Sequence, residues 1–288
     1  MKFNDYLFRS SEETLEEAAL NIGDKSRTYP KSGHIMILVG GAGSGKTFIS
    51  NAFITFEGKY FNVDDLKTKL LKYKPTTLVK KFEQFSGRYI ESIKMENPDD
   101  VALMHMFFKK EGTDKAMQDA FFTAARSASE KPNAIFDVTM KDLKKLKEIA
   151  EYAEFAGYDK KNIHIVWILN DVSVAYKQNK ERTRSVPEEI FFQTHTGASL
   201  SMKELIDNSN EYRKYMDGEI WVMPNRARKD NDVVFGKNKQ GEKIVSQVKF
   251  YAAFKVKAVG KPSLKVDQIE KKIFDKIQDY VPKEGKWE

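Results

Sequence analysis

Residues 40–47 read Gly40-Gly41-Ala42-Gly43-Ser44-Gly45-Lys46-Thr47. The stretch matches the phosphate-binding pattern G-x-x-x-x-G-K-[ST] at every required position. Glycines let such a loop bend tightly with its N–H groups turned inward, and the following helix adds the partial positive charge of its amino end. We therefore expect all eight residues to bind the phosphates of ATP. Lys46 is expected to reach the β- and γ-phosphates as a catalytic cation, and the Thr47 hydroxyl to coordinate Mg²⁺.

The sequence on either side of this loop provides the context that the pattern requires. Residues 34–39 are almost continuously apolar and partly β-branched, which is typical of a buried parallel strand. Residues 46–56 have a helical pattern. The alternatives are a chance glycine-rich turn and a degraded loop. The strand and helix on either side argue against the first, and the complete motif argues against the second.

Further strands are expected along the chain, alternating with helical patterns. These strands are residues 59–63, 134–138, 163–169 and 220–222. Residues 141–155 carry apolar side chains at helical spacing. The alternation predicts an α/β fold, in which a parallel sheet is flanked by helices and the active site lies at the carboxyl ends of the strands. Together with the loop, this pattern indicates a P-loop NTPase fold.

The composition excludes several kinds of site. The 288 residues are 41% apolar and 32% charged, with no apolar run that approaches the ~18 residues of a spanning helix. Since no secretory signal or transit peptide is visible either, we expect a cytoplasmic protein without membrane association. Cysteine is absent, which excludes disulfides, thiolate nucleophiles and zinc ribbons. The four histidines lack ligand spacing, so oxygen atoms are expected to hold any metal.

Two carboxylates and a basic stretch indicate phosphoryl transfer. Asp64 follows the expected second strand, where a carboxylate can take a proton from an acceptor hydroxyl, although many such residues merely cap a helix. Asp137 ends an apolar run, a pattern typical of a carboxylate that holds Mg²⁺ and its bound substrate. Arg182 and Arg184 lie in a basic stretch that can close over ATP as a lid, unless it is only a solvated helix face.

The order of these motifs resembles the P-loop kinases that include bacteriophage polynucleotide kinase and, more distantly, zeta toxins. The matching pieces, between about Gly33 and Thr196, are the loop, Asn62-Val63-Asp64-Asp65-Leu66-Lys67, Ile135-Phe136-Asp137-Val138-Thr139 and the lid with Val186-Pro187. The resemblance implies that Asp64 is the general base and that Arg182 contacts the ATP phosphates. Lys67 would contact the acceptor, where an arginine with a bidentate fork is usual. Gln178 stands where a basic residue is expected, and Arg184 could compensate.

These expectations divide the chain into three parts. Residues 1–32 are expected to form an N-terminal helical extension. Residues 33–224 are expected to form the P-loop kinase domain, with a helical insertion for acceptor selectivity at 66–131 and the lid at 177–187. Residues 225–288 are expected to form a basic β-hairpin and a C-terminal helix.

The acceptor is the least determined part of the prediction. The formal net charge is +7, and residues 225–265 hold eleven Lys and Arg against three Asp and Glu, interleaved with Phe235, Phe250, Tyr251 and Phe254. Such a segment suits a nucleic-acid groove, but it also suits a hairpin with core aromatics and solvated lysines.

We therefore expect transfer to a hydroxyl of a nucleic acid or nucleotide, either a 5′-hydroxyl or a hydroxyl on a modified base in DNA. A phage source, and hence a host cytoplasm, is compatible with the composition. One alternative is a zeta-toxin-like kinase of a nucleotide sugar or other small molecule. The other is a non-enzymatic nucleotide-binding protein with a structural or regulatory role. The oligomeric state is left open.

Overall fold

The computed structural model describes residues 30–54, 56–170, 172–181, 186–224, 233–237, 243–248 and 253–264. Several predictions lie outside these residues. They are the N-terminal helical extension, the C-terminal helix, and the lid arginines Arg182 and Arg184. Within the described parts of the chain, no helix is both long and apolar enough to cross a bilayer.

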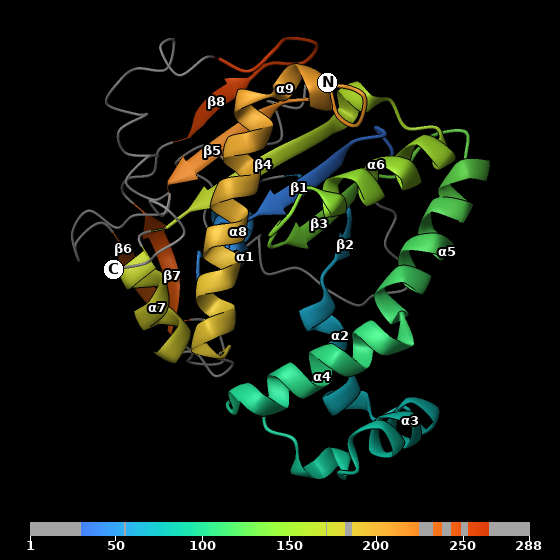
Figure 1. Ribbon diagram of the computed structural model, residues 1–288, viewed down its shortest axis with the longest axis vertical. Coiled ribbons are helices and arrows are strands. Elements are labelled where there is room, and N and C mark those ends of the chain that lie inside the picture. Colours follow the sequence, from blue (N-terminus) through green and yellow to red (C-terminus); the bar gives the residue numbers. More distant parts are fainter. Residues whose placement is uncertain are drawn as a thin grey trace.

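The centre of the molecule is a mixed sheet, and the described residues contribute six strands to it (Figure 1). In sheet order these strands are β2 (Lys59–Phe61), β3 (Ala134–Val138), β1 (Ile35–Val39), β4 (Ile163–Leu169), β5 (Ile220–Pro224) and β8 (Phe254–Lys257). The first five are parallel, whereas β8 pairs antiparallel with β5. The α/β fold predicted from the sequence is confirmed, with one antiparallel edge strand added.

The sheet is buried on both faces, and alternate residues of β1 divide between two cores. Ile35, Ile37 and Val39 belong to a core that includes residues of α5 (Thr113–Ser127), α6 (Lys144–Ala156) and α8 (Glu188–Asp207). Met36 and Leu38 point to the other core, which includes Ile49 of α1 (Lys46–Phe53). Burial on both faces explains why the strand is apolar at every position rather than at alternate positions.

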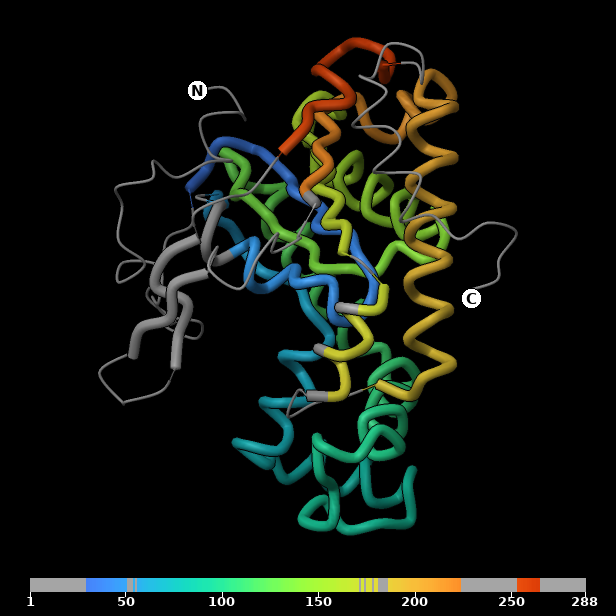
Figure 2. Tube along the Cα trace, turned by 90° about the vertical axis from the view of Figure 1, so that its left-hand side faces the viewer, coloured from blue at the N-terminus to red at the C-terminus, as the bar shows by residue number. Residues whose placement is uncertain are grey.

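The insertion between β2 and β3 forms a helical lobe with a core of its own (Figures 1 and 2). Its elements are α2 (Val63–Tyr73), α3 (Thr76–Ser86), the 3₁₀ helix η3 (Ile90–Ser92) and α4 (Pro98–Glu111). Phe82, Met104 and Phe107 are fully buried within it. The lobe projects from the sheet, and α5 leads from it back beside α6 and the sheet, towards β3 (Figure 1). The expected helical insertion is present, and its first helix begins three residues before the predicted boundary.

The remaining elements connect or extend the domain. They are the 3₁₀ helix η4 (Lys160–Asn162), α7 (Val172–Glu181), α9 (Ser209–Tyr212) and the antiparallel hairpin of β6 (Val233–Lys237) and β7 (Lys243–Val248). This hairpin lies in the segment 225–288, where a basic β-hairpin was expected. α7 occupies the first half of the stretch predicted to be a lid.

Two of the element boundaries that differ from the prediction do so for local reasons. The second strand was expected to reach residue 63, but it ends at Phe61 because Asn62 caps α2 with its side chain. The helix expected from residue 141 begins at Lys144. Met140, just before it, has a positive φ of 54°, so the chain turns sharply between β3 and the helix.

Candidate nucleotide and phosphoryl-transfer site

The glycine loop connects the end of β1 to the start of α1, as the motif requires. Gly45 is the N-cap of α1 and has φ 88° and ψ 21°, a left-handed conformation that favours glycine. A Cβ atom on Gly43, which also has a positive φ, would lie 2.5 Å from the carbonyl oxygen of Ala175. The loop is therefore tightly enclosed by α7, and a side chain at position 43 would push the two segments apart.

Lys46 folds back over the loop that carries it. Its Nζ donates to the carbonyl oxygen of Gly40 at 2.6 Å and to that of Gly41 at 3.3 Å. The same ammonium lies 3.7 Å from Oδ1 of Asp137, on β3. Phosphate oxygens are stronger partners for a cation than neutral carbonyls, so a bound nucleotide can displace these contacts. Thr47 follows in the first turn of α1 and is exposed, so its hydroxyl is accessible.

Asp137 is held by two donors from the neighbouring strand and the loop after it. Tyr60 donates its hydroxyl to Oδ2 at 2.7 Å, and Asn62 donates Nδ2 to the same oxygen at 3.1 Å. Burial raises the pKa of Tyr60 far above its usual value, and the nearby Asp137 carboxylate raises it further. The phenol therefore stays protonated and serves as a permanent donor. Asp137 thus faces Lys46 with one oxygen and is anchored through the other.

Asn62 connects this carboxylate to the helix that carries Asp64. Its Oδ1 accepts from the backbone N–H of Asp64 at 2.8 Å and so caps α2, while its Nδ2 donates to Asp137. One amide side chain therefore joins the two carboxylate positions predicted from the sequence. The prediction assigned no role to Asn62 or Tyr60. The signal for Asn62 was present, because Asn directly before an acidic first turn is a preferred N-cap.

Asp64 lies in the first turn of α2 and is paired with Lys67. Lys67 Nζ donates to Asp64 Oδ1 at 3.0 Å. The Lys67 side chain is only 4% exposed, whereas that of Asp64 is 35% exposed. The carboxylate is thus open to solvent, and the ammonium behind it is buried. Contact between Lys67 and an acceptor stays a prediction, and in this structure the ammonium is directed at Asp64.

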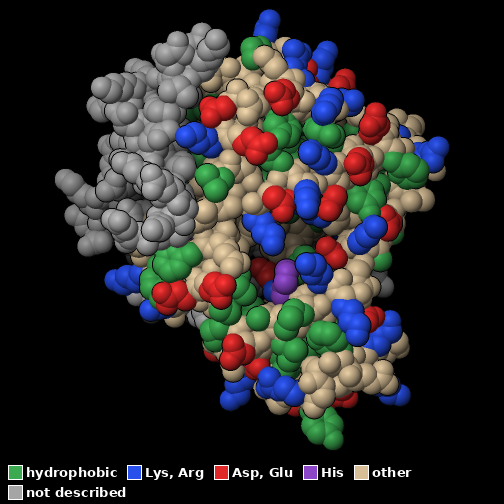
Figure 3. All heavy atoms as spheres, viewed as in Figure 1, with side chains coloured by type: hydrophobic (Ala, Val, Ile, Leu, Met, Phe, Trp, Pro, Cys, Tyr) green, Lys and Arg blue, Asp and Glu red, His purple; other side chains and the backbone are tan. Residues whose placement is uncertain are grey.

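The surface is hollowed between the insertion lobe and the rest of the molecule, and a histidine side chain lies in this hollow among basic and acidic neighbours (Figure 3). His105, on α4, is close enough to Lys67 and Asp64 for both charges to act on it. Partial burial lowers the pKa of His105, and Lys67 lowers it further, while Asp64 opposes the shift. The imidazole is therefore neutral at pH 7.

The oxygen atoms at this site are suitable ligands for magnesium bound together with a nucleotide. Among the described residues, no group of three or more His, Asp or Glu side chains is arranged to hold a metal ion. Mg²⁺ at phosphoryl-transfer sites commonly takes one or two protein oxygens and completes its shell with phosphates and water. The exposed Thr47 hydroxyl and the Asp137 carboxylate fit this requirement, and the glycine loop fits a phosphate chain.

Comparison with known proteins adds little to this geometry. No protein-family model and no curated protein match the chain. A chain from the PezAT chromosomal toxin–antitoxin system of Streptococcus pneumoniae has 13% identity and a TM-score of 0.44, over 92% of this chain and 82% of that one. A chain of AvrRxo1-ORF1:-ORF2 with ATP has 13% identity and a TM-score of 0.43, over 87% and 65%. TT1252 from Thermus thermophilus has 14% identity and a TM-score of 0.28. Likenesses this low carry no argument about chemistry, so the site rests on its own geometry.

Proposed function

We propose that this protein is an ATP-dependent kinase that transfers the γ-phosphoryl group to a hydroxyl of a nucleic acid or nucleotide, with Asp64 as the general base. The observation that carries the proposal is the bridge made by Asn62. It ties Asp137, which faces the loop lysine, to the first turn of the helix that presents Asp64. The phosphate end of the site and the candidate base are thereby parts of one hydrogen-bonded unit.

The proposed reaction uses each of these side chains in a defined way. The acceptor oxygen bonds to the γ-phosphorus while Asp64 takes its proton, and the bond from phosphorus to the β–γ bridging oxygen breaks so that ADP leaves with the electron pair. The buried Lys67 ammonium orients the Asp64 carboxylate through its hydrogen bond to Oδ1. Lys46 neutralises charge on the phosphates. When bound, Mg²⁺ held by Thr47 and Asp137 would polarise the phosphoryl oxygens.

Arg182 and Arg184 belong to the same proposal. They follow α7 directly in the sequence, and Ala175 of that helix lies against the glycine loop. Arginines on such a segment would contact the ATP phosphates and stabilise charge that develops during transfer. We therefore include both with the eight loop residues as the nucleotide-binding set.

The position of the insertion lobe beside Asp64 supports the proposal that the acceptor is larger than water. Asp64 and Lys67 lie on α2, at the root of the lobe, and His105 lies on α4 near them. The basic C-terminal segment supports a polynucleotide acceptor less than its composition suggested. Lys255 is paired with Glu219 at 2.7 Å and Lys257 with Asp217 at 3.1 Å, so these two lysines are used within the protein.

The test is incubation with γ-labelled ATP and Mg²⁺ against DNA, RNA, modified-base DNA and nucleotide sugars. We expect label on a nucleic acid or nucleotide, and Asp64→Asn should reduce transfer by about 10² to 10⁴-fold while ATP binding is retained. Asp99→Asn is a matched control. Asp99 also lies in the first turn of a helix, and its N–H is likewise capped by an Asn two residues before it.

Each outcome has a defined meaning. Transfer to a nucleotide sugar alone would support the zeta-toxin-like alternative. ATP binding without labelling of any acceptor would support a structural or regulatory protein. Full activity of Asp64→Asn would contradict the assignment of the base.

A further inference from the structure

The glycine loop is held in the middle by two consecutive residues of α8. The backbone N–H of Ala42 donates to Thr194 Oγ1 at 3.3 Å, and His195 Nε2 lies 2.6 Å from the carbonyl oxygen of Ala42. Both polar groups of one loop residue are therefore bonded to side chains about 150 positions later in the sequence. Nothing in the proposed transfer reaction has so far used Thr194 or His195.

The contact defines the protonation state of His195. A carbonyl oxygen can only accept, so Nε2 must carry the hydrogen. Burial lowers the pKa of His195 to about 4, the hydrogen bond to Ala42 opposes this shift, and the nearby Lys46 ammonium lowers the pKa further. At pH 7 the ring is therefore neutral, with its one hydrogen on Nε2.

Thr194 is arranged in the complementary way. Its hydroxyl donates to the backbone carbonyl of Phe191 at 2.8 Å, which leaves oxygen lone pairs directed at the Ala42 N–H. Phe191 also packs its ring against that of His195, with 4.5 Å between the centroids. One turn of α8 thus presents an acceptor and a donor at fixed positions.

The glycine loop packs so closely against α8 that there is no room for a side chain on the loop at this contact. A Cβ atom on Gly41 would lie 2.4 Å from the His195 ring, and one on Gly43 would strike the Ala175 carbonyl of α7. The loop therefore lies between α7 and α8, and its shape depends on both helices. The Ala42 peptide is the point where α8 controls that shape by hydrogen bonds.

We propose that His195 is a positioning residue that holds the Ala42 peptide, and with it the amides of the following residues, in the conformation that binds the nucleotide phosphates. Thr194 supports it from the N–H side. This inference rests on the proposed nucleotide binding by the loop. It adds that the affinity of the loop for phosphate depends on His195, a neutral histidine that is protonated at Nε2 and lies far from the loop in the sequence.

The binding test compares His195→Gln with His195→Leu by titration with Mg–ATP. Glutamine can present an amide N–H near the position of Nε2, whereas leucine fills similar volume without a donor. We expect His195→Leu to weaken Mg–ATP binding about tenfold or more and His195→Gln to restore most of the loss. Gln193→Leu is the matched control, because Gln193 is an exposed neighbour on α8 that bonds to Glu189 of its own helix.

Two further measurements separate the possible failures. Thr194→Val keeps the side-chain shape and should weaken Mg–ATP binding by a smaller factor, even if His195→Leu does not fold. Nitrogen chemical shifts assigned to His195 in the wild type, by comparison with His195→Gln, should show this ring protonated only at Nε2 and unchanged down to pH 5. Equal Mg–ATP affinity in wild type and folded His195→Leu, or an Nδ1-protonated ring, would overturn the inference. If the wild type binds no nucleotide while the Nε2 tautomer is seen, the proposed function itself fails.

Discussion

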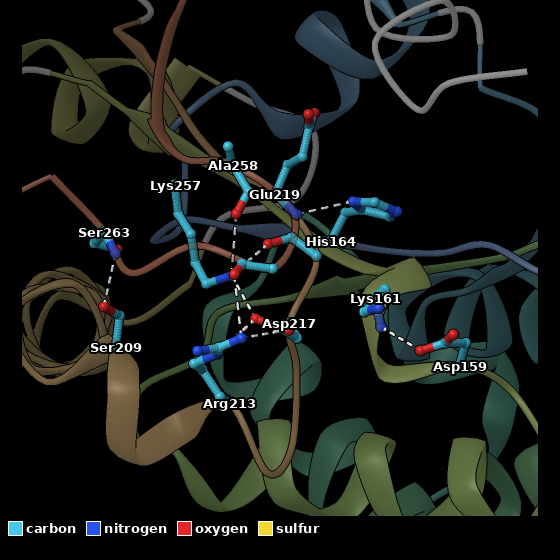
Figure 4. Close-up of polar contacts among 12 residues, drawn as sticks. Asp159, Lys161, His164, Ser209, Arg213, Asp217, Glu219, Lys257, Ala258 and Ser263 are labelled. Carbon is cyan, nitrogen blue, oxygen red and sulfur yellow. Dashed lines mark hydrogen bonds and ion pairs between the residues drawn. The ribbon is translucent and has the colours of Figure 1, made fainter.

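The two ends of the central sheet use the same kinds of charged residue for different purposes. At the carboxyl end, Lys46 contacts two neutral carbonyls at short range and Asp137 at 3.7 Å. At the amino end of β5, Asp217 is bonded at once to Arg213 and to the buried Lys257 (Figure 4). The Lys46 ammonium can exchange its partners for phosphate oxygens, whereas the buried Lys257 ammonium is held in a fixed position by its partners.

The amino-end cluster is satisfied by short contacts throughout. Arg213 makes two bonds to the Asp217 carboxylate, at 3.0 and 3.1 Å. Lys257 is 2% exposed and also donates to the carbonyl of Gly218 at 3.0 Å. Burial alone would raise the pKa of Asp217, but hydrogen bonds from Arg213 and Lys257 outweigh it and hold the pKa below its usual value. The cluster fastens the antiparallel strand β8 to the sheet.

The comparison teaches that the partner of a charged group, and not its residue type, separates structural from chemical use. A buried charge with ionic and hydrogen-bonded partners cannot change them without a large cost in stability. A charge that rests on carbonyls is available for a ligand. The predictions below test this distinction at one end of the sheet or the other.

Lys257→Met should show the largest effect, at the amino end. Removing Lys257 leaves the buried Asp217 carboxylate with fewer hydrogen-bond donors. We therefore expect the free energy of unfolding to fall by about 3–5 kcal/mol. Urea denaturation measures the change, and Lys261→Met, at an exposed position, is the control. An unchanged unfolding midpoint would show that the cluster does not hold the fold together.

Lys46→Met should produce the converse result at the carboxyl end. We expect phosphoryl transfer to fall by about 10² to 10³-fold, since a cation on the phosphates is lost. The free energy of unfolding should change by less than about 1 kcal/mol, because the lost contacts are to carbonyls and to a carboxylate that keeps two other donors. Transfer assays and urea denaturation on the same samples check both parts. A large loss of stability would mean that Lys46, like Lys257, holds the fold together.

Acidification should destabilise the protein through His195. Its pKa is about 4 in the folded protein and about 6.5 in an unfolded chain, so between these values the unfolded chain binds more protons. The free energy of unfolding should therefore fall as the pH drops from about 6.5 to about 4, with at most about 3 kcal/mol from this residue. Denaturation at several pH values measures the slope, which should be smaller in His195→Gln. His34 and His164, whose pKa values burial also lowers, should maintain a residual slope in the variant.

Tyr60→Phe should have the smallest effect. Asp137 loses one of its two donors to Oδ2 but keeps Asn62, so we expect about a five- to tenfold loss of transfer and a higher Mg²⁺ concentration at half-maximal rate. A magnesium titration of the transfer rate measures this. Tyr73→Phe is the control, since Tyr73 is 65% exposed on the insertion lobe. If magnesium dependence did not change, Tyr60 would have no role in holding Asp137 for the metal.

Much of the fold followed from local pattern, and the errors occurred where a side chain made a contact that the pattern does not encode. The strands at 134–138 and 163–169 were predicted at their observed bounds because their burial makes them apolar at every position except Asp137 and His164. The second strand was predicted too long because the capping bond of Asn62 ends it. β8 was assigned to an extension, but it completes the edge of the main sheet.

The candidate site divides in the same way. Residues 40–47 and Asp64 could be selected from the sequence, because their spacing reflects the shape of a phosphate chain and the start of a helix. The buried state of Lys67 could not, since a lysine on an amphipathic helix is ordinarily solvated and only the packing of other elements around α2 buries this one. The roles of Arg182, Arg184 and the C-terminal aromatics Phe250 and Tyr251 stay predictions, as they lie outside the described residues.

The sequence by itself determined the parallel α/β core and the phosphate loop, because strand burial, helix periodicity and tight glycine turns all act between residues close in the chain. Only the tertiary structure decided which distant side chains hold that loop and that core. His195 reaches Ala42 across 153 positions and Lys257 reaches Asp217 across 40, and such contacts depend on how helices and strands pack. No local pattern records them, since the free energy of a long-range contact is realised only when the whole domain has folded.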